Sequence, residues 1–242
     1  MNIAVLLAGG TGQRFGASVP KQFVTLNDKP MIVYALEIYE RSPHIDAVEV
    51  VCVPEYIPLV RQWADRWGIT KLKWIVEGGS SCQESTYKGI LGLERHCSQD
   101  DLIMLGMSTS IFVDEDIISD SLRVCKKFGN AFAAMQCIYN LAYTDDGESF
   151  EKINRKEKHR TINMPWTAPY GTWDTLYRKA AQENIEMKAD SYAPTLFLAM
   201  GETLYFSKDT PKNKIHVTTQ QDYDILCALF EYEKRSKDKC DI

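Results

Sequence analysis

A glycine-rich stretch with two basic residues lies near the start of the chain. It reads LLAGGTGQRFG over residues 6–16 and is followed by PKQF at 20–23. The apolar run that precedes it is typical of a buried parallel strand. Glycines after such a strand leave backbone N–H groups open at the carboxyl edge of a sheet, where open α/β proteins bind ligands. Because Arg14 and Lys21 add fixed positive charge, the stretch predicts a polyphosphate site with two cations directed at charge that develops during transfer.

The spacing of this stretch differs from two commoner phosphate loops. A Walker loop ends in Gly-Lys-Ser/Thr, and the stretch has no such ending. The dinucleotide fingerprint is matched only loosely by Gly10, Gly12 and Gly16. For the glycines alone, a tight strand-to-helix turn is the structural alternative. Arg14 and the Pro-Lys-Gln that follows favour the phosphate site.

The rest of the chain alternates apolar strand patterns with amphipathic helix patterns. This alternation implies right-handed crossovers and a doubly wound, mostly parallel α/β sheet in a single domain over 1–242. The pattern predicts further strands at 47–53, 72–76, 102–105, 131–138, 203–206 and 214–217. It predicts helices at 30–41, 55–67, 80–97, 114–128, 171–182 and 190–200, and a last helix from Thr219 with Asp222 in a capping box.

One polar segment, at about 139–164, interrupts the alternation. It holds Asp145-Asp146-Gly147 as a turn signal between two short strand-like runs, which predicts a projecting β-hairpin arm. Its basic side chains are Lys152, Arg155, Lys156, Lys158, His159 and Arg160. For most of them a solvated charged loop is the better interpretation.

Composition limits the classes of function. The chain has 242 residues, 45% hydrophobic content and a formal net charge of −5, which suits one large core and argues against a nucleic-acid binder. No apolar run is long enough to span a bilayer, and no signal sequence is evident. The seven cysteines are scattered without Cys-x-x-Cys pairs. We expect a cytoplasmic protein that binds neither nucleic acid nor membrane.

The first motif resembles the signature of the cytidylyltransferases that act on methylerythritol phosphate and ribitol phosphate, which are glycosyltransferase-A-like nucleotidyltransferases. The later stretches 77–79, 85–91, 160–169 and 215–222 fall in the family's order, so the resemblance spans nearly the whole chain. It implies a Rossmann-like fold of the nucleotide-diphospho-sugar transferase type. It also implies that the arm embraces a second subunit in a homodimer.

The resemblance implies a simple reaction. A phosphate oxygen of a ribitol-, glycerol- or methylerythritol-type phosphate attacks the α-phosphorus of CTP, and pyrophosphate leaves. The product would be a CDP-polyol precursor of a surface polysaccharide or of isoprenoids. Mg²⁺ normally bridges the triphosphate and is held through a carboxylate.

The resemblance also assigns roles by position. The implied catalytic residues on the phosphates are Arg14, Lys21, Lys214 and His216, the last two on one face of the expected strand 214–217. The implied nucleotide-binding residues are Leu7, Ala8, Gly9, Gly10, Gly12, Gly79 and Ser85. Arg160 of the neighbouring subunit would hold the substrate phosphate and Asp190 the substrate hydroxyls. Asp222 is a weak candidate for the metal.

Several family positions carry other residues in this chain, and one of them is His216, which stands where the family has a lysine that contacts the phosphates. Where the family has an aspartate that binds metal and a nearby arginine, the chain has Met107 and Ser110, and Cys82 replaces a second arginine. A thioether does not hold Mg²⁺, which prefers oxygen ligands. Two functions stay open: a cytidylyltransferase for a different polyol phosphate, and a catalytically impaired relative that binds nucleotide or a partner subunit without turnover. A structural module without a ligand leaves Arg14 and Lys21 unexplained.

Overall fold

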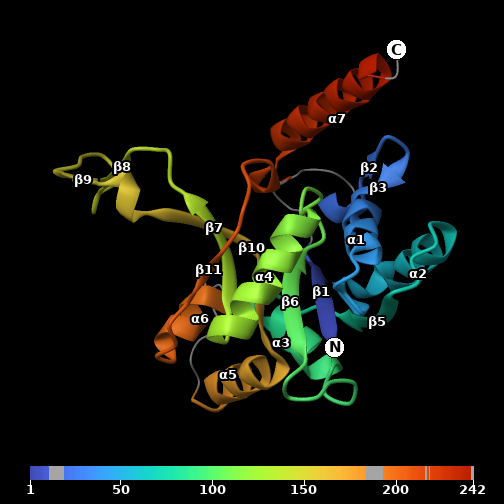
Figure 1. Cartoon of the computed structure of the whole chain (residues 1–242), viewed down its shortest axis with the longest axis horizontal. Coiled ribbons are helices and arrows are strands. Elements are labelled where there is room, and N and C mark those ends of the chain that lie inside the picture. Colours follow the sequence, from blue (N-terminus) through green and yellow to red (C-terminus); the bar gives the residue numbers. More distant parts are fainter. Residues whose placement is uncertain (11–18, 184–192, 216, 218, 241–242) are drawn as a thin grey trace.

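The computed structural model describes residues 1–10, 19–183, 193–215, 217 and 219–240, and these residues form a seven-stranded sheet with helices on both faces (Figure 1). In sheet order the strands are β11 (Phe206–Ser207), β7 (Ala131–Gln136), β10 (Arg160–Pro169), β6 (Leu102–Met107), β1 (Asn2–Ala8), β4 (Ala47–Cys52) and β5 (Leu72–Glu77). β1 pairs in parallel with β4 and β6, as do β4 with β5 and β7 with β11, whereas β10 runs antiparallel to β6 and β7. The prediction of a mostly parallel doubly wound sheet is confirmed.

Helices cover both faces of the sheet because the central strands are apolar on both sides. In β1, Leu6 packs toward the face covered by α1 (Met31–Arg41), α2 (Ile57–Arg66) and α4 (Glu115–Phe128). Its neighbour Val5 packs toward the face covered by α3 (Cys82–Gly92), α5 (Tyr170–Gln182) and α6 (Ala193–Ala199). Successive side chains of a strand point to opposite faces, so a continuous apolar run fills both cores.

Local capping sets where the helices begin and end. The Asp114 carboxylate accepts the Ile117 N–H at 2.9 Å at the start of α4, and Gly129, with φ of 92°, ends that helix. The Ser81 hydroxyl accepts the Glu84 N–H at 3.1 Å and starts α3. The predicted helix 80–97 is too long, because α3 ends at Gly92 and tight turns follow. The predicted helix 55–67 begins instead as a 3-10 turn, η3 (Pro54–Tyr56), before α2.

The predicted strand 214–217 is wrong, because none of its described residues, 214, 215 and 217, lies in a strand. Lys214 ends a 3-10 turn, η5 (Lys212–Lys214), instead of starting a strand. Pro211 precedes the turn in a helical backbone conformation, and the Asn213 side chain is buried and bonded to backbone on another element. These local interactions favour a turn over a strand at this place.

The hairpin arm is confirmed and projects from the body of the molecule (Figure 1). Its strands β8 (Leu141–Tyr143) and β9 (Lys152–Asn154) pair antiparallel, and η4 (Lys156–Lys158) follows. At its tip the Asp146 carboxylate accepts the N–H groups of Glu148 and Ser149, each at 2.9 Å. β10 then runs from the arm into the centre of the sheet, so arm and sheet share one strand.

The remaining elements lie at the top of the view in Figure 1. The two-stranded sheet of β2 (Thr25–Leu26) and β3 (Lys29–Pro30) follows η2 (Lys21–Phe23). The first turns of α7 (Gln220–Cys240) pack there, with Leu226 in one apolar cluster with Leu26 and Met31. No helix in the described part of the chain is long and apolar enough to cross a membrane.

Candidate active site at the carboxyl edge of the sheet

Gln22 holds the start of the glycine-rich loop. Its side-chain amide donates to the Ala8 carbonyl at 2.7 Å and to the Gly10 carbonyl at 2.8 Å, and the residue is 2% exposed. Gln22 belongs to η2, which begins at Lys21, so the same turn brings the lysine next to the loop that leaves β1. Sequence reasoning missed this role of Gln22. Its place in the PKQF motif was the available signal.

A second glycine loop packs directly against the first. A Cβ on Gly9 would lie 3.0 Å from the Ser85 Oγ, and a Cβ on Gly78 would lie 3.2 Å from the Gly9 Cα. A Cβ at either position would therefore require the neighbouring atoms to move by a few tenths of an ångström. The Ser85 hydroxyl also accepts the Gly79 N–H at 3.0 Å. The structure thus brings three predicted nucleotide-binding residues, Gly9, Gly79 and Ser85, into one backbone-lined corner.

The same corner lies at the start of α3 and carries a lysine that the sequence analysis did not select. Lys88 donates to the Gly78 carbonyl at 3.0 Å and lies 3.6 Å from the Glu84 carboxylate. Cys82, which stands where the family has an arginine, is partly buried, and burial raises the pKa of its thiol. A neutral thiol supplies neither the charge nor the reach of a guanidinium, so Cys82 cannot perform the function of an arginine at this position.

The turn after β6 carries hydroxyls in place of charged groups. Ser108 donates to the Leu7 carbonyl through its N–H at 3.1 Å and its hydroxyl at 2.9 Å, which ties the turn to the end of β1. Thr109 and Ser110 are each 2% exposed, and their hydroxyls have no hydrogen-bond partner within the described residues. Met107 pairs with Leu7 in the β1–β6 ladder. At the two positions where the resemblance implies an aspartate and an arginine, this edge therefore carries the uncharged side chains of Met107 and Ser110.

The donor set at this edge can be compared with the requirements of magnesium. Within the described residues, no group of three or more histidine, cysteine, aspartate or glutamate side chains could hold a metal ion. The Asp222 carboxylate accepts the Thr219 N–H at 2.7 Å, and the Thr219 hydroxyl accepts the Asp222 N–H at 3.2 Å, which confirms the capping box. Mg²⁺ at nucleotide sites usually keeps several waters and is held through one or two carboxylates and the substrate phosphates, so it does not require a cluster of three protein ligands.

The segment that contains Lys214 lies beside the turn after β6. Val217 packs in one cluster with Ile111, and the Lys212 ammonium lies 5.1 Å from the centre of the Phe112 ring. Lys214 is partly buried at the end of η5. Because Lys214 is not on a strand, the strand premise behind its expected pairing with His216 is wrong, and His216 itself lies outside the described residues.

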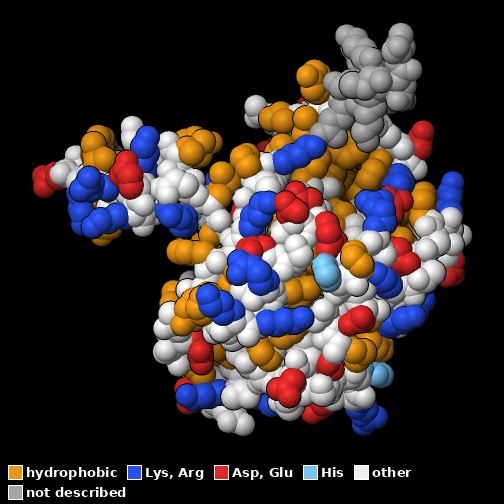
Figure 2. Space-filling view, in the orientation of Figure 1, with side chains coloured by type: hydrophobic (Ala, Val, Ile, Leu, Met, Phe, Trp, Pro, Cys, Tyr) orange, Lys and Arg blue, Asp and Glu red, His pale blue; other side chains and the backbone are white. Residues whose placement is uncertain are grey.

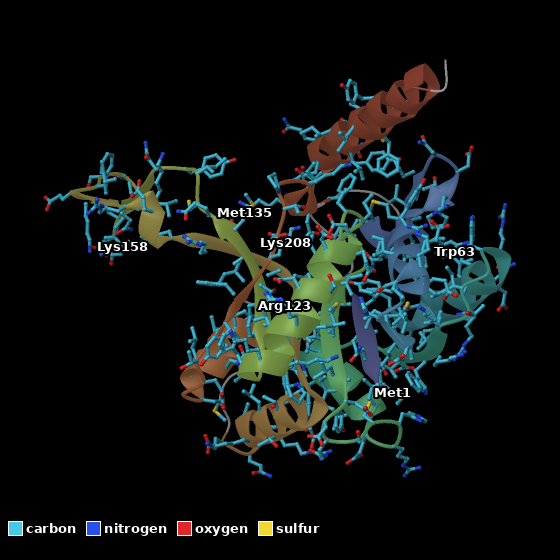
Figure 3. The ribbon with its side chains drawn as sticks, viewed as in Figure 1. Met1, Trp63, Arg123, Met135, Lys158 and Lys208 are labelled. Carbon is cyan, nitrogen blue, oxygen red and sulfur yellow. The ribbon has the colours of Figure 1, made fainter. Side chains whose placement is uncertain are left out.

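Arg160 lies at the base of the arm, where β10 begins. It is exposed, and its guanidinium contacts the Glu157 carbonyl at 3.3 Å and the His159 carbonyl at 3.2 Å. The arm extends away from the sheet, with Lys158 of η4 far from the body and Met135 at the base (Figure 3). The predicted residues Gly12, Arg14, Asp190 and His216 lie outside the described residues.

Comparison with known proteins decides the family. The family model described as 2-C-methyl-D-erythritol 4-phosphate cytidylyltransferase (IspD) matches residues 2–228. The chain belongs to this family of cytidylyltransferases. Its membership agrees with the carboxyl-edge geometry of the two glycine loops.

Relatives of two named activities match nearly the whole chain. Ribitol-5-phosphate cytidylyltransferase of Lacticaseibacillus paracasei is 33% identical over 238 residues, which cover 98% of this chain and 100% of that protein. The 2-C-methyl-D-erythritol 4-phosphate cytidylyltransferase of Petrotoga mobilis is 27% identical over 96% of this chain and 99% of that protein. Among solved structures, 4-diphosphocytidyl-2C-methyl-D-erythritol synthase of Anaerococcus prevotii has a TM-score of 0.78 at 15% identity and covers 96% of this chain and 98% of that one. This last likeness supports the fold.

Proposed function

We propose that the protein transfers CMP from CTP to ribitol 5-phosphate and releases pyrophosphate. The observation that carries the proposal is the corner formed by the Gly9 and Gly78 loops, held by Gln22 and Ser85, at the carboxyl edge of β1. We propose ribitol 5-phosphate and not methylerythritol phosphate as the substrate, because the 33% identical relative that matches from end to end is a ribitol-5-phosphate cytidylyltransferase by name.

The reaction requires positioning more than covalent chemistry. An oxygen of the ribitol phosphate forms a bond to the α-phosphorus of CTP, the bond from that phosphorus to the bridging oxygen breaks, and pyrophosphate leaves with the electron pair. In this proposal the backbone groups of Ala8, Gly9 and Gly79 bind the edge of the cytosine and its ribose. A tight corner lined by backbone would also exclude a purine base, which is larger than cytosine. Lys21, with Arg14, would bind the triphosphate and stabilise charge on the leaving pyrophosphate.

We propose further that the arm docks on a second copy of the chain. Its exposed hydrophobic side chains are Ile138, Tyr139, Tyr143, Phe150, Ile153 and Ile162, which are 50–64% exposed. Figure 2 shows hydrophobic side chains next to basic ones along this arm. Exposed apolar surface of this kind marks an interaction site. Docking would carry Arg160 toward the neighbour's substrate phosphate, where its planar fork suits a phosphate.

One observation favours a second function, a relative that binds nucleotide without turnover. Met107, Ser110 and Cys82 stand where the resemblance implies a carboxylate and two guanidinium groups. Each 1.4 kcal/mol of transition-state stabilisation that is lost without replacement lowers the rate about tenfold.

A kinetic panel separates these functions. Purified protein is given CTP and either ribitol 5-phosphate, glycerol phosphate or methylerythritol phosphate, and pyrophosphate release is followed, with CTP affinity measured in parallel by calorimetry. The proposal predicts the highest kcat/KM for ribitol 5-phosphate. A higher value for methylerythritol phosphate would reassign the substrate, and CTP binding without turnover on any of the three would favour the second function.

A further inference from the structure

Two buried asparagines join β10 to the segment before Lys214. Asn163 donates through its side chain to the Asn213 carbonyl at 2.8 Å, and Asn213 donates through its side chain to the Met164 carbonyl at 2.9 Å. Asn213 is 1% exposed and Asn163 is 8% exposed. Each side chain therefore binds the other segment's backbone, in a reciprocal pair that we name the asparagine clamp.

The local backbone of β10 makes the clamp possible. The register between β10 and β7 shifts between Ile162 and Trp166, so the ladder is interrupted at Asn163. At this irregularity the Asn163 side chain accepts the Met164 N–H at 2.9 Å, and the Asn163 carbonyl accepts the Trp166 indole N–H at 2.8 Å. Irregularities of this kind redirect side chains and are frequent next to active sites.

The clamp is not an arrangement that maximises stability. The Asn213 side-chain carbonyl and one oxygen of Asp209 are buried and have no hydrogen-bond partner within the described residues. A partly satisfied buried network is less stable than apolar packing of the same volume. Its geometry is nonetheless specific, because Asn213 also donates to the other Asp209 oxygen at 2.8 Å. This combination indicates that the clamp sets a position.

The clamp joins two parts of the proposed machinery. β10 begins at Arg160, three residues before Asn163, at the base of the arm. On the other side, Asn213 directly precedes Lys214, and the chain then packs through Val217 beside the turn after β6. A displacement of the arm that moves the start of β10 therefore reaches the Lys214 segment through two side-chain hydrogen bonds.

We propose that Asn163 and Asn213 are positioning residues that couple the arm to Lys214. Through the clamp, the position of the arm determines how well ordered the segment with Lys214 is. A second subunit that binds the arm therefore also orders Lys214 in the active site of the subunit that donates the arm. The proposal rests on the proposed function for the role of Lys214. The coupling itself is a property of the free chain and is measured without substrate.

The test uses Gln136, which fastens the arm base from the neighbouring strand β7. Its side chain donates to the Lys156 carbonyl at 2.6 Å, and it takes no part in the clamp or the proposed site. Gln136→Ala loosens the arm base and Asn163→Ala opens the clamp. Hydrogen exchange is followed at the amides of Lys214 and Ile215, which are bonded within η5 in the full-length protein.

The expected result is non-additive. Asn163→Ala raises exchange at Lys214 and Ile215 about tenfold, which corresponds to about 1.4 kcal/mol. Gln136→Ala raises it about threefold in the wild-type chain and clearly less in the Asn163→Ala chain, because only the Asn213 bond to the Met164 carbonyl still joins the two segments. Asn213→Ala, which removes the opposite bond, behaves as Asn163→Ala does and serves if that variant does not fold.

Asn130→Ala is the matched control. Asn130 is another buried amide, donating to the Thr203 carbonyl at 2.9 Å and accepting the Tyr205 N–H at 3.1 Å. Its loss leaves exchange at Lys214 unchanged, because it lies at the other end of β7. Unchanged exchange at Lys214 in Gln136→Ala, or equal effects of Gln136→Ala with and without the clamp, would overturn the coupling.

Kinetics then connect the clamp to the reaction. In the active enzyme Asn163→Ala lowers kcat about tenfold and changes the KM for CTP little, because the glycine loops and Lys21 still hold the nucleotide. An equal loss through KM would contradict a role through Lys214. If the wild-type protein shows no turnover, the proposed function fails, and the exchange result still decides whether the clamp couples the two segments.

Discussion

Gln22→Met tests whether the order of the glycine loop limits catalysis. The substitution keeps the length and approximate volume of the side chain and removes the donor that serves the Ala8 and Gly10 carbonyls at 2.7 and 2.8 Å. The Ala8 carbonyl is buried, and leaving a buried acceptor without a donor costs about 1–3 kcal/mol. The partly buried bond to Gly10 adds about 0.5–1.5 kcal/mol. The two together amount to about 1.5–4.5 kcal/mol.

These energies predict two measurable losses. If an ordered loop is required to bind and position the triphosphate, kcat/KM for CTP falls by roughly 10- to 1,500-fold, at about tenfold for each 1.4 kcal/mol. The Tm falls by about 3–18 °C in a domain of this size. Pyrophosphate release gives the first quantity and circular dichroism on heating gives the second.

Asn130→Ala is again the control, because it also removes two hydrogen bonds between a buried amide and backbone. It lies at the amino end of β7, away from the glycine loops, and is expected to lower the Tm while leaving kcat/KM within about twofold of wild type. If Gln22→Met loses thermal stability as the control does but keeps its kcat/KM, the loop's order is not needed for catalysis and the reasoning is refuted.

Three further predictions concern the core and the arm. Glu49 is fully buried, and neither of its carboxyl oxygens has a hydrogen-bond partner within the described residues. Burial raises the pKa of this carboxyl well above the usual 4.5. The protonated side chain therefore contributes its full stability below pH 4.5, and this stability is lost as the pH rises toward the folded pKa. This titration makes the free energy of unfolding fall by about 1.4 kcal/mol per pH unit, and Glu49→Gln is expected to remove that slope. Urea unfolding at several pH values measures the slope, and the same slope in both proteins would contradict the assignment to Glu49. Arg160→Ala is expected to raise the KM for ribitol 5-phosphate about tenfold with little change in CTP affinity. Arg155→Ala, at another exposed arginine of the arm, is expected to change neither. Equal losses for both substrates in Arg160→Ala would contradict the assignment of Arg160 to the phosphate site. Ile153 on the arm is 64% exposed, and Ile153→Asp is expected to shift the protein from dimer to monomer in sedimentation. Leu198→Asp on α6, at a residue 59% exposed, is expected to leave the dimer intact. A monomeric wild-type protein would contradict the docking role of the arm.

Hydrophobic periodicity predicted most of the sheet and the helices on it. The apolar runs of β1, β4 and β6 are long enough to identify buried parallel strands, and Asp114 and Gly129 mark the limits of α4 in the sequence itself. The arm was also predictable, because an Asp-Asp-Gly turn between short strand-like runs is a local signal.

Features that depend on contacts between distant segments were not predictable. Gln22 acts on carbonyls 12 and 14 residues away, and the PKQF motif draws attention to the residue without indicating these partners. The strand expected at Lys214 is a 3-10 turn because Asn213 is held by β10, 49 residues earlier at Met164. The family resemblance identified the positions of Met107 and Ser110, but only the structure shows that this turn is tied to β1 through Ser108.

The most direct test of the central claim is detection of the product. Wild-type protein and Lys21→Ala are each incubated with CTP and ribitol 5-phosphate, and CDP-ribitol is measured by mass spectrometry alongside pyrophosphate. We expect one CDP-ribitol for each pyrophosphate from the wild-type protein and no product from a folded Lys21→Ala protein. No product from a wild-type protein that binds CTP, or an unchanged rate in Lys21→Ala, would contradict the proposed transfer of CMP to ribitol 5-phosphate.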